Sequence, residues 1–155
     1  MEIKNILKIK TYNETETIEC GRIFAPRLND GDFIALYGDV GAGKTAFVKG
    51  IADIITPEAY VRSPTYALVN VYENYSNKRR ICHFDMYRIN GEDDLYSVGF
   101  DDYLTERKNI IIVEWCENVP FALPEEYYKI TIEIVDFNSR IITIDRVFKN
   151  DNIGA

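Results

Sequence analysis

One stretch of the sequence has the residue types and spacing that hold phosphate groups. Residues 38–45 read Gly-Asp-Val-Gly-Ala-Gly-Lys-Thr and fit the pattern G-x-x-x-x-G-K-S/T. Glycines there allow successive backbone N–H groups to turn inward around a phosphate. The side chain of Lys44 is long enough to reach β- and γ-phosphates, and the Thr45 hydroxyl is a suitable Mg²⁺ ligand. The residues expected to bind the phosphates of a nucleotide are Gly38, Asp39, Val40, Gly41, Ala42, Gly43, Lys44 and Thr45.

Two acidic residues are placed to complete such a site. Asp85 and Glu114 each end an apolar segment, residues 81–85 and 110–114, that is typical of a buried strand. Parallel strands direct their carboxyl ends toward the nucleotide crevice of an α/β sheet. A phosphate site of this kind needs an acid to bind Mg²⁺ or to orient water. Hydrophobic periodicity does not say which of the two carboxylates has which role.

An α/β sheet is required to position the loop and the two acids. The order strand, phosphate loop, helix and further strands predicts a sheet that is partly parallel and partly antiparallel. Strands are predicted at residues 7–10, 33–37, 66–75, 80–87, 109–115, 128–137 and 140–148. Helices are predicted at residues 14–28 with a kink or early end at Pro26, at residues 45–55, and as one or two short helices within residues 91–103. The last two strands are expected to form a closing hairpin around Asn138 and Ser139.

The length and charge of the chain restrict the kinds of function. A length of 155 residues suits one domain, and we expect residues 1–155 to form a single P-loop domain with a loose tail after about residue 150. The formal net charge of −7 argues against strong direct binding to nucleic acid, which needs clustered Lys and Arg. The single histidine, His83, excludes metal sites that need two or three histidines.

Cysteine usage and the lack of long apolar segments predict a cytoplasmic location. Cys20, Cys82 and Cys116 lie far apart, which suits reduced thiols better than a disulfide framework. Residues 1–5 show no apolar core of a signal peptide. The longest aliphatic run, residues 110–113, is far shorter than the ~20 residues of a membrane span.

Four motifs together resemble the bacterial TsaE (YjeE-type) family. They are the phosphate loop, Ser-Pro-Thr-Tyr at residues 63–66, His-Phe-Asp-Met-Tyr-Arg at residues 83–88, and Val-Glu-Trp at residues 113–115. Many families share the phosphate loop, whereas the combination of the four motifs in this order and spacing is specific. The resemblance covers nearly the whole chain. It implies a P-loop NTPase fold in which helices flank a mixed parallel and antiparallel sheet with a C-terminal β-hairpin.

The resemblance also implies a biological role. The family is a Mg²⁺-dependent ATPase required for threonylcarbamoyladenosine formation at position 37 of tRNAs that read ANN codons. It does not transfer the threonylcarbamoyl group; TsaD, bound to TsaB, does so with the threonylcarbamoyl-AMP that TsaC makes. The implied partner is the TsaB–TsaD complex, which ATP hydrolysis allows to turn over repeatedly. ATP, with ADP as product, and Mg²⁺ are therefore the expected cofactors, with slow hydrolysis alone, stimulation by the partners and only indirect action on tRNA.

Carried over residue by residue, the resemblance implies roles within the site. Lys44 holds the β- and γ-phosphates, Thr45 and Glu114 bind Mg²⁺, and Asp85 is the acid important for hydrolysis. The expected catalytic residues are therefore Lys44, Asp85 and Glu114, and the expected metal ligands are Thr45 and Glu114.

Further family positions lie outside the phosphate loop. Glu14, Trp115 and Arg140 stand where the family contacts the nucleotide, although Trp115 equally suits a plain core position. Residues 63–66 resemble a switch segment near the γ-phosphate, with a simple turn before a strand as the alternative. His83 suits a hydrogen-bonded structural histidine.

Two positions depart from the family pattern. Ala46 stands where many members have a second hydroxyl residue, which implies a weaker contact to the α-phosphate at this position of the site. Cys116 stands where many members have proline, so its backbone N–H is free and the local turn is less constrained. Neither departure removes Lys44 or Thr45.

Three other functions are alternatives to this one. A GTPase would need an Asn-Lys-x-Asp segment, and the Asn-Lys-Arg-Arg of residues 77–80 lacks the aspartate. A nucleotide or small-molecule kinase would need a lid with several arginines, and no such insertion is visible. A nucleotide-gated binding module, in which hydrolysis is incidental, remains the alternative to a working ATPase.

Overall fold

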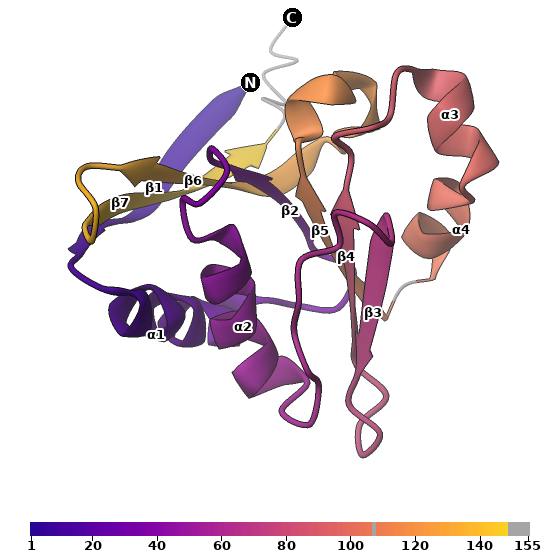
Figure 1. Cartoon of the computed structure of the whole chain (residues 1–155). Helices are drawn as coiled ribbons and strands as arrows, with labels where there is room; N and C mark the ends of the chain where they lie inside the picture. The colour runs from indigo at the N-terminus through magenta and orange to yellow at the C-terminus, as the bar shows by residue number, and fades with distance from the viewer. Residues whose placement is uncertain (107, 149–155) are drawn as a thin grey trace, which may run out of the picture.

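A seven-stranded mixed sheet runs through the centre of the computed structural model, which describes residues 1–106 and 108–148 (Figure 1). The strands lie in the order β1-β7-β6-β2-β5-β4-β3. Their bounds are β1 Glu2–Thr11, β2 Phe33–Tyr37, β3 Val69–Glu73, β4 Arg80–Asp85, β5 Asn109–Glu114, β6 Glu126–Ile134 and β7 Arg140–Phe148. The pairs β6–β2, β2–β5 and β5–β4 are parallel, whereas β1–β7, β7–β6 and β4–β3 are antiparallel. This confirms the mixed sheet and the closing hairpin predicted from the sequence.

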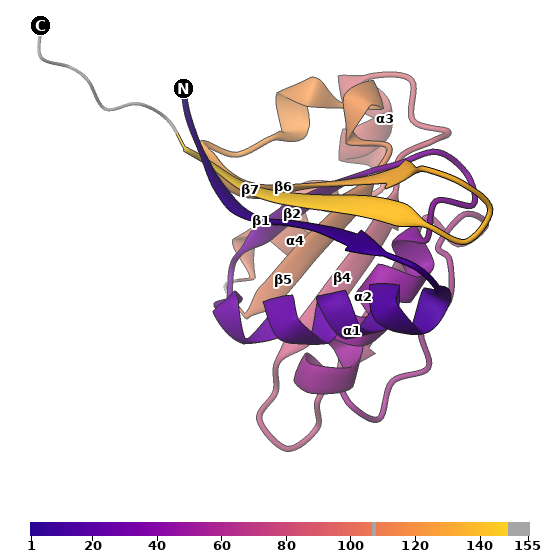
Figure 2. The same cartoon turned by 90° about the vertical axis from the view of Figure 1, so that its left-hand side faces the viewer.

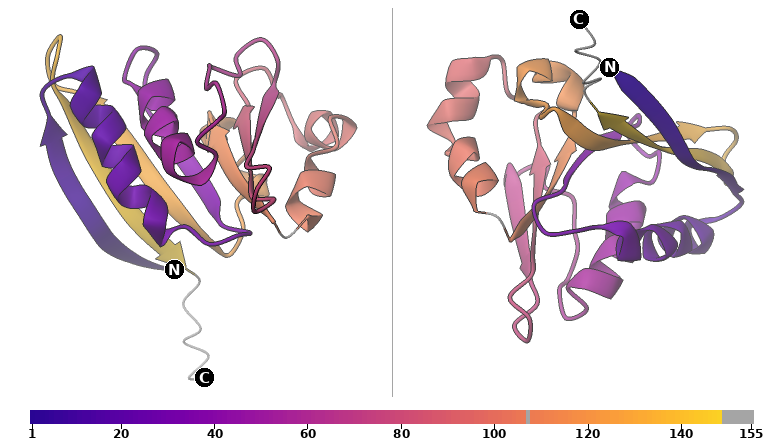
Figure 3. Two further views of the ribbon diagram at one scale, coloured as in Figure 1. Left: turned by 90° about the horizontal axis from the view of Figure 1, so that it is seen from below. Right: turned by 180° about the vertical axis from the view of Figure 1, so that it is seen from behind.

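Helices cover both faces of the sheet. Helices α1 (Glu14–Phe24) and α2 (Lys44–Ile55) lie side by side on one face (Figure 2). Helices α3 (Glu92–Ser97) and α4 (Phe100–Thr105) lie beyond the other face, near β4 (Figure 3). The 3₁₀ turns are Ala25–Arg27, Cys116–Asn118 and Pro120–Ala122. Each face therefore has its own apolar core, one between the sheet and α1 and α2 and one between the sheet and α3 and α4.

Local sequence signals explain where α1 begins and ends. Asn13 caps the helix, because its side-chain oxygen accepts a hydrogen bond of 2.9 Å from the backbone N–H of Glu16. The Glu16 carboxylate in turn accepts from the backbone N–H of Tyr12 at 2.8 Å. The α-helix ends at Phe24 and continues as a single 3₁₀ turn that contains Pro26. The predicted early end at Pro26 is therefore confirmed.

Helices α1 and α2 approach each other closely through two glycines. A Cβ atom at Gly21 would lie 2.3 Å from the carbonyl oxygen of Phe47, and one at Gly50 would lie 2.0 Å from that of Ile18. Both distances are far below van der Waals contact, so only glycine fits at this crossing. The close approach brings the first turn of α1 near the loop that precedes α2.

The register of three parallel strands places the two acids together. Leu36 in β2 is opposite Glu114 in β5, and Glu114 is opposite Asp85 in β4. The backbone N–H of Met86 donates to the carbonyl of Glu114 at 3.0 Å and prolongs this alignment by one residue. Because the phosphate loop follows β2 directly, both carboxylates end beside it.

Several element bounds differ from the prediction for physical reasons. β1 begins at Glu2 rather than residue 7, because its pairing with β7 extends as far as Phe148. β3 begins at Val69 rather than residue 66, because the N–H groups of Ala67 and Leu68 bond to the carbonyl of Pro64 in a turn. The tail expected after residue 150 lies outside the described residues. None of the helices in the described ranges has the length and apolar character that crossing a bilayer requires.

Candidate functional site

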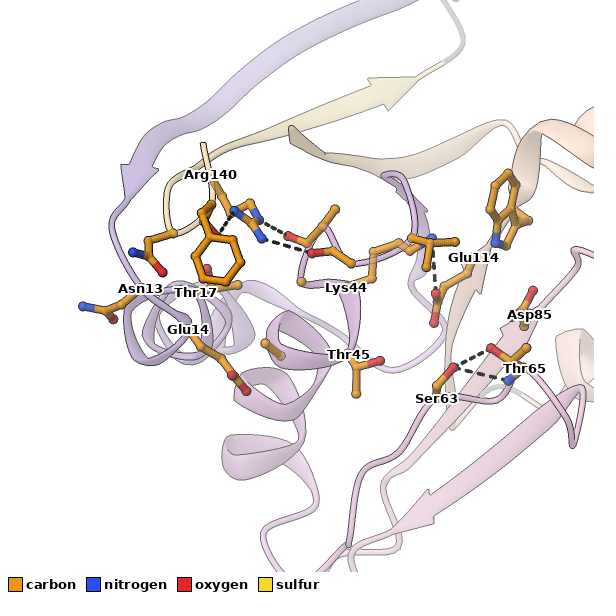
Figure 4. A pocket seen from close by; sticks show the side chains of 18 residues that line it. Asn13, Glu14, Thr17, Lys44, Thr45, Ser63, Thr65, Asp85, Glu114 and Arg140 are labelled. Atoms are coloured by element: carbon orange, nitrogen blue, oxygen red, sulfur yellow. Dashed lines mark hydrogen bonds and ion pairs between the residues drawn. The ribbon is translucent and has the colours of Figure 1, made fainter. Parts of the chain in front are cut away.

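A pocket of about 470 Å³ opens at the carboxyl ends of β2, β5 and β4 (Figure 4). Five segments line it: the start of α1, the phosphate loop, residues 63 and 65, the ends of β4 and β5, and the tip of the β6–β7 hairpin. The lining residues are Asn13, Glu14, Thr17, Val40, Gly41, Ala42, Gly43, Lys44, Thr45, Ala46, Ser63, Thr65, Asp85, Glu114, Trp115, Phe137, Asn138 and Arg140. Most of the residues predicted for the site therefore meet in one place. Gly38 and Asp39 are not among the lining residues.

The phosphate loop has the backbone of an anion cradle. Gly41 and Gly43 have φ angles of +82° and +106°, which residues with a side chain rarely adopt. A Cβ atom at Gly41 would meet nothing within 4 Å, so the space above the loop is open to a ligand. Asp39 shapes the turn, because its carbonyl accepts from the N–H of Ala42 at 3.0 Å. The loop then leads into α2, whose free N-terminal N–H groups favour an anion.

Glu114 stands between Lys44 and His83. The Lys44 Nζ lies 3.5 Å from Oε1 of Glu114, and the His83 Nε2 lies 2.5 Å from Oε2. The side chains of Lys44, His83 and Glu114 are 8 %, 0 % and 5 % exposed. A buried carboxylate is stable only with such partners, so Lys44 and His83 together compensate for the burial of Glu114.

These partners determine the charge of Glu114. Burial by itself raises the pKa of the carboxyl group, but the hydrogen bond to His83 and the charge of Lys44 outweigh it, so the pKa is lowered. Glu114 is therefore ionised at neutral pH. An ionised carboxylate is the form that binds a divalent cation.

Asp85 is the second carboxylate of the pocket. It is 5 % exposed, and its Oδ1 accepts a hydrogen bond of 2.9 Å from the backbone N–H of Tyr87. This bond holds the carboxyl group at the strand end, beside Glu114 and facing the same pocket as Thr45.

The donor set suits Mg²⁺ together with phosphates. Thr45, Asp85 and Glu114 offer oxygen atoms, which this cation prefers. Within the described part of the chain, no group of three or more His, Cys, Asp or Glu side chains is arranged to hold a metal by itself. Mg²⁺ bound through one or two carboxylates plus substrate phosphates and water needs no such group.

Trp115 adopts an unusual backbone conformation at the pocket. Its φ of +58° and ψ of +38° are left-handed, which a residue with a bulky side chain rarely adopts. Its ring lies 4.9 Å from the Nζ of Lys44 and makes an edge contact with Tyr87. Trp115 therefore lines the pocket while it also packs against the core on the α3 side.

Arg140 reaches the phosphate loop from the far end of the chain. Its Nε donates to the carbonyl of Ala42 at 2.9 Å and its Nη2 to that of Gly41 at 3.1 Å, as Figure 4 shows. Its Nη1 donates to carbonyls of its own hairpin, including that of Asp136 at 2.9 Å. The guanidinium group therefore fastens the β6–β7 hairpin to the loop. Glu14, at the first turn of α1, lines the same side of the pocket.

The Ser-Pro-Thr-Tyr segment forms a turn at the pocket. The hydroxyl groups of Ser63 and Thr65 lie 2.6 Å apart and both residues line the cavity. The next residue, Tyr66, is 90 % exposed, with the guanidinium of Arg88 5.7 Å from its ring. The segment is thus both a turn and part of the pocket wall.

Four pocket residues were not predicted from the sequence: Asn13, Thr17, Phe137 and Asn138. Asn13 had a usable signal, because an Asn before two glutamates is a typical helix cap. Thr17 and the hairpin residues had none, because α1 and the hairpin approach the loop only through the tertiary fold.

Comparisons with known proteins point to one family. A family model described as threonylcarbamoyl adenosine biosynthesis protein TsaE matches residues 11–142. The tRNA threonylcarbamoyladenosine biosynthesis protein TsaE of Rickettsia typhi is 33 % identical over 135 residues, which span 86 % of this chain and 91 % of that protein. The protein of the same name from Bacillus subtilis is 33 % identical over 141 residues, 91 % of this chain and 86 % of the relative. The crystal structure of Bacillus subtilis YdiB superposes with a TM-score of 0.74 at 28 % identity, covering 95 % of this chain and 88 % of that chain.

Proposed function

Because the chain belongs to the TsaE family of threonylcarbamoyladenosine biosynthesis proteins, we propose that it is a Mg²⁺-dependent ATPase that supports this tRNA modification. The observation that carries the proposal is the meeting of Lys44, Thr45, Asp85 and Glu114 in one pocket beside a glycine-rich phosphate loop. Together the loop and these side chains provide an anion-binding backbone, the positive charge of Lys44, and two carboxylates. Phosphoryl transfer to water requires groups of these kinds.

The phosphate loop and four side chains of the pocket have tasks in this chemistry. The N–H groups of the loop and the Nζ of Lys44 bind the phosphates and lower their negative charge. Thr45 and Glu114 would hold Mg²⁺, which would neutralise negative charge on the phosphates. Asp85 orients the attacking water through its carboxylate, which the N–H of Tyr87 holds in place.

The partner in the proposal is the TsaB–TsaD complex rather than the tRNA. The formal net charge of −7 disfavours contact with a phosphate backbone. The pocket is lined by groups that serve nucleotide binding in this proposal. Residues 1–155 act in it as one ATPase domain. Hydrolysis would then reset the complex for another round at position 37 of tRNAs that read ANN codons. The location would be the cytoplasm, where thiols such as those of the three buried cysteines stay reduced.

ATP hydrolysis by the purified protein, alone and with saturating TsaB–TsaD, tests the proposal. We expect slow hydrolysis alone and faster hydrolysis with the complex. Asp85→Asn is expected to stop hydrolysis and repeated tRNA modification, whereas the exposed control Asp101→Asn should behave as wild type.

Two results would contradict the proposal. One is hydrolysis that saturating TsaB–TsaD does not stimulate. The other is repeated modification by Asp85→Asn without hydrolysis, which would favour a nucleotide-gated binding module instead.

A further inference from the structure

His83 is a fully buried polar residue with one polar partner. Its ring is 0 % exposed, and the contact of Nε2 with Glu114 is the only hydrogen bond that the described residues give it. Its Nδ1 is buried and has no hydrogen-bond partner among those residues. Burying a polar ring costs free energy unless the ring is hydrogen-bonded. The hydrogen bond with Glu114 therefore offsets the cost of burying the His83 imidazole.

The backbone leaves this contact little freedom. His83 is opposite Ile112 in the parallel register of β4 and β5, two residues before Asp85 and Glu114. Its side chain therefore lies on the same face of the sheet as both carboxylates. The ring of Tyr72 on β3 packs on it, with the ring centroids 6.4 Å apart. Two central strands and an aromatic neighbour thus hold the imidazole in place.

The two oxygens of Glu114 consequently have different surroundings. Oε2 is held by the buried imidazole, whereas Oε1 is turned toward Lys44 and the phosphate loop. A side chain fixed at one oxygen presents the other in a defined direction. Partners of this kind orient the ligands of metal sites.

We propose that His83 is a positioning residue that holds the Glu114 carboxylate ready for Mg²⁺. The inference rests on the proposed function, since it assigns Glu114 to the metal. A purely structural histidine would differ in one respect: its loss would lower stability and leave the cation affinity of the folded protein unchanged.

A pair of amide substitutions separates these two roles. His83→Gln places its amide nitrogen near the position of Nε2, and His83→Asn places it near Nδ1, away from Glu114. Cys82→Ala is the stability control, because Cys82 is the buried neighbour in β4 whose side chain belongs to the core on the opposite face.

The experiment measures Mn²⁺ binding to the protein–ADP complex by electron paramagnetic resonance, together with ADP binding in EDTA and the Tm. We expect His83→Asn to weaken Mn²⁺ binding roughly tenfold or more, as loss of a partner to a metal ligand does. His83→Gln should recover most of that loss, and Cys82→Ala should lower the Tm without changing Mn²⁺ binding. Metal-free ADP binding should stay within about twofold throughout, because the proposed function assigns the phosphates to the loop and Lys44 and assigns Glu114 to the metal.

Other outcomes have distinct meanings. Wild-type Mn²⁺ affinity in folded His83→Asn would overturn the positioning role, and so would equal losses in the Gln and Asn variants. If His83→Asn does not fold, wild-type Mn²⁺ affinity in a His83→Leu variant would overturn the role in the same way. Absence of Mn²⁺ binding to the wild-type ADP complex would overturn the proposed function itself, and the inference with it.

Discussion

The Nζ of Lys44 and the Oε1 of Glu114 form an ion pair of 3.5 Å inside the pocket, and both side chains are more than nine-tenths buried. One partner comes from the phosphate loop and the other from the end of β5. The Lys44 ammonium group, proposed to bind phosphate, and the Glu114 carboxylate, proposed to bind Mg²⁺, therefore neutralise each other. Changing either residue alters the charge that the other must carry.

Lys44→Ala should weaken ATP binding roughly 10- to 100-fold, because hydrogen bonds to charged groups contribute about 1.5–3 kcal/mol. Lys49→Ala is the matched control, since Lys49 is exposed on the same helix. Calorimetric titration of both variants with ATP measures the difference. Equal affinities in the two variants would count against a phosphate role for Lys44.

The lowered pKa of Glu114 predicts acid-dependent stability. A carboxyl group whose pKa is lower in the folded than in the unfolded state stabilises the fold above its unfolded pKa, and this contribution is lost as pH falls through the folded pKa. The free energy of unfolding should therefore fall more steeply for wild type than for Glu114→Gln as the pH is lowered from about 5 to 3. Urea denaturation over this range measures it, and parallel curves would refute the prediction.

Arg140→Lys should weaken nucleotide binding roughly tenfold, or about 1.4 kcal/mol, since a lysine cannot bond the carbonyls of Gly41, Ala42 and the hairpin together. Arg79→Lys is the control. The Arg79 guanidinium also makes more than one hydrogen bond, to the Asp30 carboxylate and the Leu28 carbonyl, but it does not line the pocket. Equilibrium binding of a fluorescent ADP analogue reports both. A loss as large in Arg79→Lys would show that the effect is not specific to the loop.

Gly50→Ala should destabilise the fold by about 3 kcal/mol or more. Alanine normally gains about 1 kcal/mol over glycine within a helix, but the Cβ would lie 2.0 Å from the backbone carbonyl of Ile18, which cannot yield cheaply. Gly91→Ala is the control, because a Cβ there meets nothing within 4 Å and should change stability by less than about 0.5 kcal/mol. Chemical denaturation distinguishes the two; a stable Gly50→Ala would mean that α1 and α2 separate easily.

The features predicted from the sequence are those that local pattern determines. The phosphate loop, the strand Phe33–Tyr37 before it and the acids at the ends of β4 and β5 follow from glycine spacing and apolar runs. The mixed parallel and antiparallel sheet was confirmed by the structure, and the family resemblance was confirmed by the comparisons; the order of the strands was not predicted.

What local pattern could not predict depends on contacts between distant segments. The link from Arg140 to Ala42 joins residues 98 positions apart, and no periodicity encodes it. Phe137, at the tip of the β6–β7 hairpin, lines the pocket only because β6 pairs with β2. The ion pair of Lys44 and Glu114 likewise depends on the register of β2 and β5.

The pairing of the first strand with the last has a consequence for biosynthesis. Glu2 is opposite Phe148, so β1 emerges from the ribosome long before its partner exists. Until β7 arrives, the N-terminal strand has an unpaired edge, and Arg140 is not there to brace the phosphate loop. Contacts so distant in sequence form slowly, which makes β7 the expected last step of folding. A nascent chain would therefore gain a finished nucleotide site only after residues 140–148 have been synthesised and have paired with β1.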